Sequence, residues 1–216
     1  MGKYYSNQQI LQDYGILFEN IKTQTELASE LAEYGYDDTE IAKGKALYDK
    51  ALEEYQKNIK ESQEETSSYA VFSQKMEKLT EVYATDRKKV RIIYKDQDDV
   101  LKNLRLKGKS SRVLANILDD IRILYVTLKE KSELLTPVKR LKIDETHLES
   151  QLEKLQEAEK AYSIYIKEKG ESQQATKNKN KALSDLEKWV REFYAIAKIA
   201  LEDKPQLLES LGKSVR

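Results

Sequence analysis

The chain has 216 residues, of which 35% are charged, and its 38 basic side chains balance its 38 acidic ones. A net charge of zero provides no overall field that would attract nucleic acid or an anionic membrane. The absence of cysteine excludes disulfides and thiol chemistry and fits a cytoplasmic location, and no stretch is long and apolar enough to span a membrane. Only seven glycines and two prolines interrupt the sequence, so long amphipathic helices are expected.

The sequence repeats itself at an offset of about 107 positions. About 21 of roughly 109 aligned positions are identical, where this composition gives about 9 by chance. Most matches fall on apolar or turn positions, whereas most polar residues differ between the copies. We therefore predict two homologous units, residues 1–107 and 108–216, that share a packing pattern.

Apolar residues at alternating steps of four and three predict one long first helix in each half. They run from Ile10 to Leu31, with Ala28 among them, and in the second half from Ile117 to Val138. Pro137 is expected to kink or end the second of these helices because it lacks an amide hydrogen.

A turn and a second helix are expected next. Gly35 suits the left-handed end of a helix, and Asp37 followed by Glu40 is typical of an N-cap, so the second helix should begin near Asp38. Polar stretches at 63–68 and 170–180 are where this helix and its copy are expected to turn back into a third helix.

Each half is thus predicted to be an up-down-up unit of three helices, each of roughly 25 to 30 residues. The chain is expected to be all-α, with six long helices in antiparallel, coiled-coil-like bundles related by an internal pseudo-twofold duplication. Gly108 marks the joint between the halves. Packing of the two units side by side or end to end stays open.

The period and helix count are similar to those of spectrin-type repeats, although Gly108 argues against the continuous helix that joins spectrin units. Two short stretches resemble a group of uncharacterised bacterial helical proteins. The first is Tyr34-Gly35-Tyr36-Asp37-Asp38 with Gly44 and Leu47, and the second is Asp203-Lys204-Pro205-Gln206-Leu207-Leu208-Glu209-Ser210-Leu211-Gly212. The resemblance implies a bacterial, all-helical protein and carries no activity.

No constellation of residues predicts catalysis. A di-metal carboxylate site in a bundle needs two Glu-x-x-His motifs, and the single histidine, His147, excludes it in that form. His147 follows Asp144 at a helix start, where a solvated side chain is expected in place of a ligand or general base. Gly108-Lys109-Ser110 lacks the upstream glycine and the strand of a phosphate-binding loop. We therefore expect no enzyme, no metal and no cofactor.

Basic residues cluster at Arg87, Lys88, Lys89 and Arg91 and form a candidate contact for phosphates. Nearby aspartates and the lack of interleaved aromatic residues favour a solvated face. Nucleic acid is therefore not the expected partner.

Tyrosine is unusually frequent, with 14 residues against three phenylalanines. Two interpretations stay open: the tyrosines cover junctions between helices, or Tyr4, Tyr5, Tyr34 and Tyr36 form a patch for a protein partner or for self-association. The expected function is a non-enzymatic structural or protein-interaction role, and the alternative is a bundle that binds a small ligand or nucleic acid. A specific site is expected where the halves differ, or along the seam between them.

Overall fold

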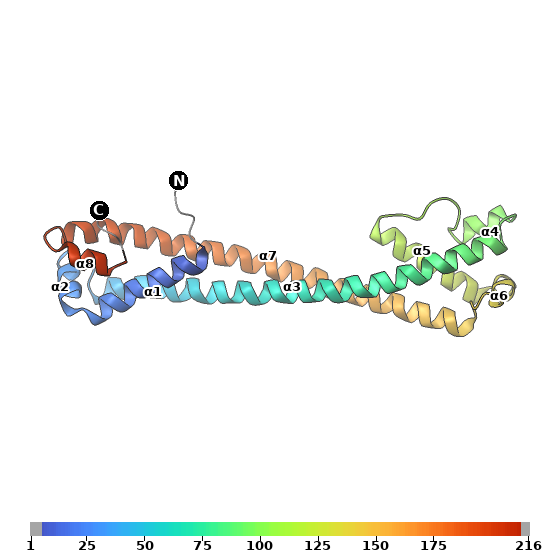
Figure 1. Cartoon of the computed structure of the whole chain (residues 1–216), viewed down its shortest axis with the longest axis horizontal. Coiled ribbons are helices and arrows are strands. Elements are labelled where there is room, and N and C mark those ends of the chain that lie inside the picture. The colour runs from blue at the N-terminus through green and yellow to red at the C-terminus, as the bar shows by residue number, and fades with distance from the viewer. Residues whose placement is uncertain (1–5, 213–216) are drawn as a thin grey trace. The chain divides into compact units, whose positions relative to one another are not determined.

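The computed structural model describes residues 6–212 and has eight helices and no strand in that range (Figure 1). The protein is all-α, as predicted. In the part of the chain that is described, no helix is long and apolar enough to cross a membrane. The helices are α1 Asn7–Thr23, α2 Thr25–Glu33, α3 Asp38–Ile93, α4 Asp98–Asn103, α5 Leu114–Glu130, α6 Ser132–Lys139, α7 Glu145–Ala200 and α8 Pro205–Ser210.

The helices form two compact units. Unit 1 comprises Met1–Gln63 and Gly170–Arg216, and unit 2 comprises Glu64–Lys169. Unit 1 therefore contains α1, α2, α8, the first part of α3 and the last part of α7, and unit 2 contains the remaining helices and segments. This division differs from the predicted boundary at 107, because each unit takes helices from both halves of the sequence, as the colours in Figure 1 show.

The order of helices repeats at an offset of 107 residues. α1 and α5 start at Asn7 and Leu114, and the long helices α3 and α7 start at Asp38 and Glu145. Each long helix has 56 residues. We call two residues that lie 107 positions apart counterparts.

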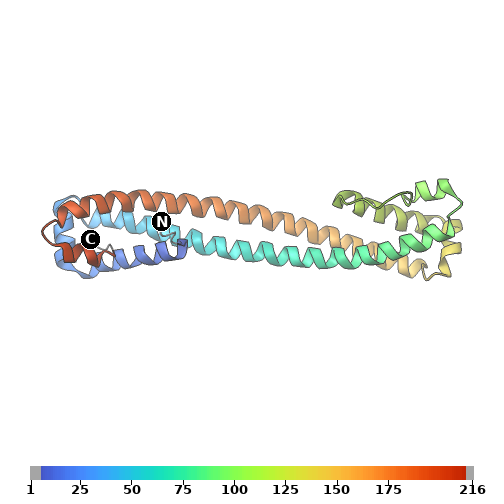
Figure 2. The ribbon, with the colours of Figure 1, turned by 45° about the horizontal axis from the view of Figure 1, so that its top comes forward.

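The predicted turns at 63–68 and 170–180 are wrong, because α3 and α7 run through these stretches (Figure 2). The expectation of six helices of roughly 25 to 30 residues fails with them. Residues 63–69 contain neither glycine nor proline, and Gly170 inside a helix costs only about 1 kcal/mol relative to alanine. Polar composition alone did not break either helix.

The first predicted helix of each half is two helices. Gln24 has an extended backbone conformation (φ −105°, ψ 96°) between α1 and α2, and its counterpart Lys131 does the same between α5 and α6. Leu31 is fully buried, as the predicted spacing requires, but the break changes two other positions: Leu27 is fully buried and Ala28 is only half-buried. Pro137 lies inside α6, which ends two residues later, near the predicted position.

The structure confirms the turn predicted at Gly35 and Asp37 before the first long helix. Gly35 has a left-handed φ of 89°, and the Glu40 amide donates to the Asp37 carboxylate over 2.9 Å. In the second half Lys142, the counterpart of Gly35, has a φ of 63°. A side chain in this conformation costs about 1 kcal/mol, so the turn is kept in both halves even where no glycine is present.

Each unit has its own apolar core. The core of unit 1 includes Phe18 and Phe193, with Trp189 packed against it. The counterparts in unit 2 are Tyr125, Asp86 and Val82. The same place in the fold is therefore aromatic in unit 1 and partly polar in unit 2.

Candidate functional site: an apolar groove in unit 1

A hollow of about 630 Å³ lies between α1, α2 and the start of α3 in unit 1, and we call it the unit 1 groove. This volume lies in the range of pockets that hold small ligands. Its large apolar side chains belong to Phe18, Ile21, Tyr36 and Ile41. The small residues that line it are Gly15, Ala28, Ala32 and Ala42, and the charged ones, all exposed, are Glu19, Lys22, Asp38 and Lys45.

Small side chains keep the unit 1 groove open. Ala28 is the counterpart of Leu135, which is only 3% exposed in the core of unit 2. Ala32 and Ala42 are the counterparts of Lys139 and Glu149. Longer side chains thus occupy, in unit 2, the positions at which unit 1 is hollow.

Two glycines let aromatic side chains approach the backbone of unit 1. A Cβ atom on Gly15 would lie 2.7 Å from the Tyr48 hydroxyl oxygen, and one on Gly44 would lie 2.4 Å from the Trp189 ring. Ordinary carbon contacts are about 3.5–4.0 Å long, so neither position accepts a side chain without movement of the aromatic ring. The counterparts of Gly44 and Trp189 are Gln151 and Val82, so unit 2 has neither the glycine nor the aromatic ring of this contact.

Trp189 is fixed in contact with the lining of the groove. Its ring stacks on Phe18 and meets Tyr36 edge-on, with centroid distances of 5.6 and 5.7 Å. The indole nitrogen donates to Glu40 over 3.0 Å, and hydrogen bonds from Lys43 and from Trp189 lower the pKa of Glu40. Burial raises the pKa of Tyr36, and the nearby carboxylates raise it further, so its hydroxyl stays neutral. The single tryptophan can therefore report on what enters the groove.

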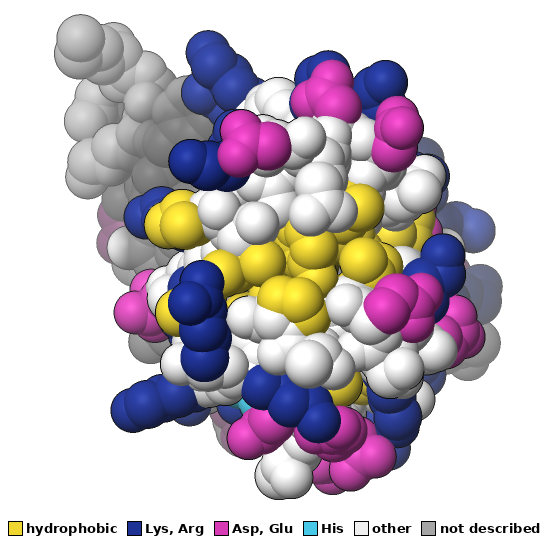
Figure 3. Space-filling view, turned by 90° about the vertical axis from the view of Figure 1, so that its right-hand side faces the viewer, with side chains coloured by type: hydrophobic (Ala, Val, Ile, Leu, Met, Phe, Trp, Pro, Cys, Tyr) yellow, Lys and Arg dark blue, Asp and Glu magenta, His cyan; other side chains and the backbone are white. Residues whose placement is uncertain are grey.

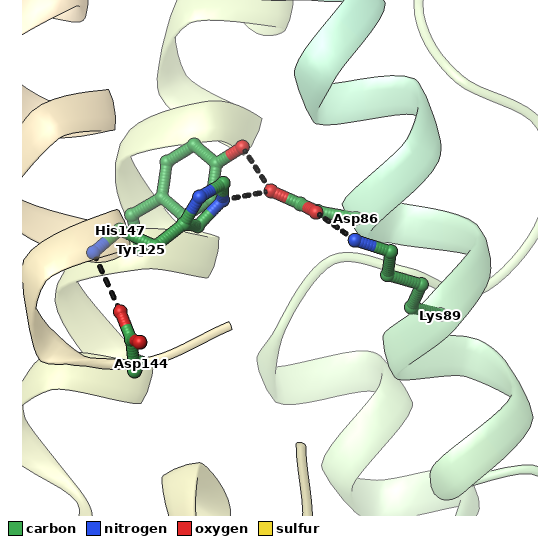
Figure 4. Close-up of polar contacts among 5 residues, drawn as sticks. All are labelled: Asp86, Lys89, Tyr125, Asp144 and His147. Carbon is green, nitrogen blue, oxygen red and sulfur yellow. Dashed lines mark hydrogen bonds and ion pairs between the residues drawn. The ribbon is translucent and has the colours of Figure 1, made fainter. Parts of the chain in front are cut away.

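Unit 2 has a buried polar cluster in place of this aromatic contact (Figure 4). Asp86 is 1% exposed; its carboxylate lies 2.5 Å from His147 Nε2, accepts from the Tyr125 hydroxyl over 3.1 Å and pairs with Lys89 over 3.2 Å. Burial and the Asp86 charge raise the pKa of Tyr125 far above its usual value, so this hydroxyl remains a donor.

The polar cluster corrects the prediction for His147, whose side chain is only 23% exposed and is held by Asp86. These contacts join α3, α5 and α7. The groups could hold a proton, but each is used in a contact between or within helices, which is the arrangement of a structural network. Sequence reasoning missed the cluster because its members lie 39 and 61 positions apart.

The predicted basic contact is divided between the surface and the interior. Arg87 is only 7% exposed, and its guanidinium donates to the backbone carbonyls of Arg105 and Gly108, over 3.2 and 2.8 Å. Lys89 pairs with Asp86, whereas Lys88 and Arg91 are exposed. The four residues therefore do not form one exposed stripe.

The predicted tyrosine patch is divided as well. Tyr34 is 48% exposed, but Tyr36 is 7% exposed and packs against Phe193 with ring centroids 5.1 Å apart. Tyr4 and Tyr5 lie outside the described residues. Tyr36 belongs to the core and to the lining of the groove, in keeping with the interpretation that tyrosines cover helix junctions.

Unit 2 has two hollows and an apolar patch of its own. A hollow of about 480 Å³ is lined by the Lys75–Glu157 ion pair (2.6 Å), and another of about 390 Å³ by Arg105, which pairs with Asp119 over 3.3 Å. Hydrophobic side chains also gather on the face that carries α4 and α6, with charged side chains around them (Figure 3). The unit 1 groove combines a hollow with a lining of mainly apolar and small residues.

Comparisons of the chain with protein-family models, with curated proteins and with solved structures find no match.

Proposed function

We propose that this protein is a non-enzymatic interaction module and that the unit 1 groove is its binding surface. The observation that carries the proposal is the exchange of Leu135 in unit 2 for Ala28 in unit 1. A bundle that serves only as a spacer gains stability when such a space is filled, as it is in unit 2. In unit 1 the space is left to another molecule.

The internal duplication belongs to the same proposal. Helix starts that recur 107 residues apart, and identities on buried positions such as Leu79 and Leu186 or Leu104 and Leu211, support descent of both halves from one helical unit. Two such halves supply the same scaffold twice. Their differences then give each unit its own surface, and the groove is one of these differences. A bacterial source and a cytoplasmic location stay predictions.

A dye titration tests the groove as a binding surface. The apolar dye anilinonaphthalene sulfonate, bound beside Phe18 and Tyr36, receives excitation energy from Trp189. We expect dye emission on tryptophan excitation with the native protein and at least about tenfold weaker binding to Ala28→Leu, which fills the groove. Ala84→Leu, an exposed position on α3 in unit 2, is the matched control and should bind like the native protein. Equal dye binding by Ala28→Leu refutes the proposal.

A bundle that binds a small ligand is the second candidate, because the groove volume of about 630 Å³ is large enough for one. Mass spectrometry of the protein under native conditions tests it, since a bound metabolite adds its mass to the native protein and not to Ala28→Leu. Nucleic acid is less favoured, because Arg87 and Lys89 already hold groups of the protein itself.

A further inference from the structure

The charged residues of the unit 1 groove differ from their counterparts in pairing. In unit 2, Lys139 pairs with Glu145 over 2.6 Å, and Lys129 pairs with Glu149 over 3.1 Å. The counterparts of these pairs in unit 1 are Ala32 with Asp38, and Lys22 with Ala42. One partner of each ion pair is thus replaced by alanine in unit 1.

Asp38 and Lys22 are therefore left on two different helices of the groove, both exposed and without a salt bridge among the described residues. Glu19 lines the groove as a second acid, whereas Lys45 is already paired with Asp49 over 2.5 Å. The groove offers an apolar space between an exposed cation, Lys22 on α1, and an exposed anion, Asp38 at the start of α3. Its occupant must match both the shape and the charges.

The side chains of unit 2 indicate what the occupant supplies. Leu135 and Lys139 are four residues apart in α6, and residues at this spacing lie on the same face of a helix. The lining residues of α1 run from Gly15 to Lys22, about 10 Å at the rise of an α-helix, which matches about two turns of a second helix. Ala28, Ala32 and Ala42 leave room for its backbone.

We infer that the unit 1 groove binds an amphipathic helix of a protein partner that carries a leucine-sized side chain, a basic residue one turn later and an acidic residue on its opposite flank. This inference rests on the proposed function and names its partner. The leucine fills the space above Ala28, the basic residue pairs with Asp38, and the acidic residue pairs with Lys22. The partner helix thus supplies three side chains that match Leu135 and Lys139 of α6 and Glu149 of α7 in unit 2.

Two stapled helical peptides of about 15 residues test the inference, since shorter unstapled helices are marginal in water. Both carry leucines on one face; the mixed-flank peptide has lysines on one flank and glutamates on the other, and the acidic-flank peptide has glutamates on both. Binding is measured by Trp189 fluorescence and by displacement of the dye. We expect the native protein to bind the mixed-flank peptide at least about tenfold more tightly than the acidic-flank peptide.

Asp38→Lys should reverse this ranking, because the groove then presents two cations. Glu145→Lys, the same change at the counterpart position of unit 2, is the matched control and should leave the ranking as in the native protein. Equal affinity for both peptides, an unchanged ranking in Asp38→Lys, or no binding of either peptide overturns the inference. If the dye still distinguishes Ala28→Leu from the native protein, the groove remains a binding surface and only its partner is wrong.

Discussion

Substitution of two glycines inside the long helices separates packing against Trp189 from helix propensity. Gly44 lies in α3 with the Trp189 ring 2.4 Å from the position of a Cβ atom, whereas Gly170 lies in α7 with nothing within 4 Å. Alanine is favoured over glycine inside a helix by about 1 kcal/mol. Gly170→Ala should therefore raise the free energy of unfolding by about that amount.

Gly44→Ala gains the same helix propensity but requires the indole ring to move by more than about 1 Å, because carbon atoms in contact are about 3.5–4.0 Å apart. Overpacking of this kind costs about 1–3 kcal/mol. The net change should lie between zero and a loss of about 2 kcal/mol. Gly44→Ala and Gly170→Ala should thus differ in stability by about 1–3 kcal/mol.

Urea unfolding followed by helical circular dichroism measures both changes, and the emission of Trp189 gives an independent signal. The emission maximum should shift in Gly44→Ala and stay constant in Gly170→Ala. If Gly44→Ala stabilises the protein as much as Gly170→Ala and leaves the tryptophan spectrum unchanged, Trp189 does not pack on this glycine. The arrangement of the groove lining would then be wrong.

Three further predictions concern the turn, the polar cluster and the groove. Lys142→Gly should raise the free energy of unfolding by about 1 kcal/mol and Gly35→Lys should lower it by a similar amount, because both positions are left-handed. Changes of the same sign in chemical unfolding would contradict this prediction. Asp86→Ala should cost about 3–5 kcal/mol, whereas Tyr125→Phe, which leaves the carboxylate its other partners, should cost about 1–3 kcal/mol, and the reverse order in urea unfolding would refute the proposed network. Ala28→Leu should raise the midpoint of thermal unfolding through a gain of up to about 2 kcal/mol from buried methylene groups, and a lower midpoint would mean that the space cannot take a leucine.

Local signals in the sequence predicted local structure well. Gly35 and Asp37 marked the end of one helix and the start of the next, and the structure confirms both through the φ angle of Gly35 and the cap on the Glu40 amide. The turn predicted at 63–68 failed because a polar stretch resembles the solvated side of a helix. Without glycine or proline, a helix that packs along its partner continues through such a stretch, as α3 does.

The break at Gln24 could not be predicted from apolar spacing, and it matters for the groove. A continuous helix would place Ala28 on the seam with Ile21, whereas the break buries Leu27 and moves Ala28 toward the surface. A sequence signal for the groove did exist. Leu135 is a large apolar residue whose counterpart is an alanine, and such an exchange indicates a space that one half fills and the other leaves open.

The two halves also show how one packing position takes two chemistries. Phe193 is fully buried among aromatic rings in unit 1, and its counterpart Asp86 is equally buried in unit 2, where a histidine and a tyrosine bind its carboxylate. A buried charge requires such partners, and together they fix α3, α5 and α7 of unit 2 in one arrangement. The aromatic contacts of unit 1 require complementary packing but no polar partners. The surface of unit 1 can therefore have an open groove beside them. Unit 2 is accordingly the unit whose space is filled by its own side chains, and unit 1 the one whose groove stays open.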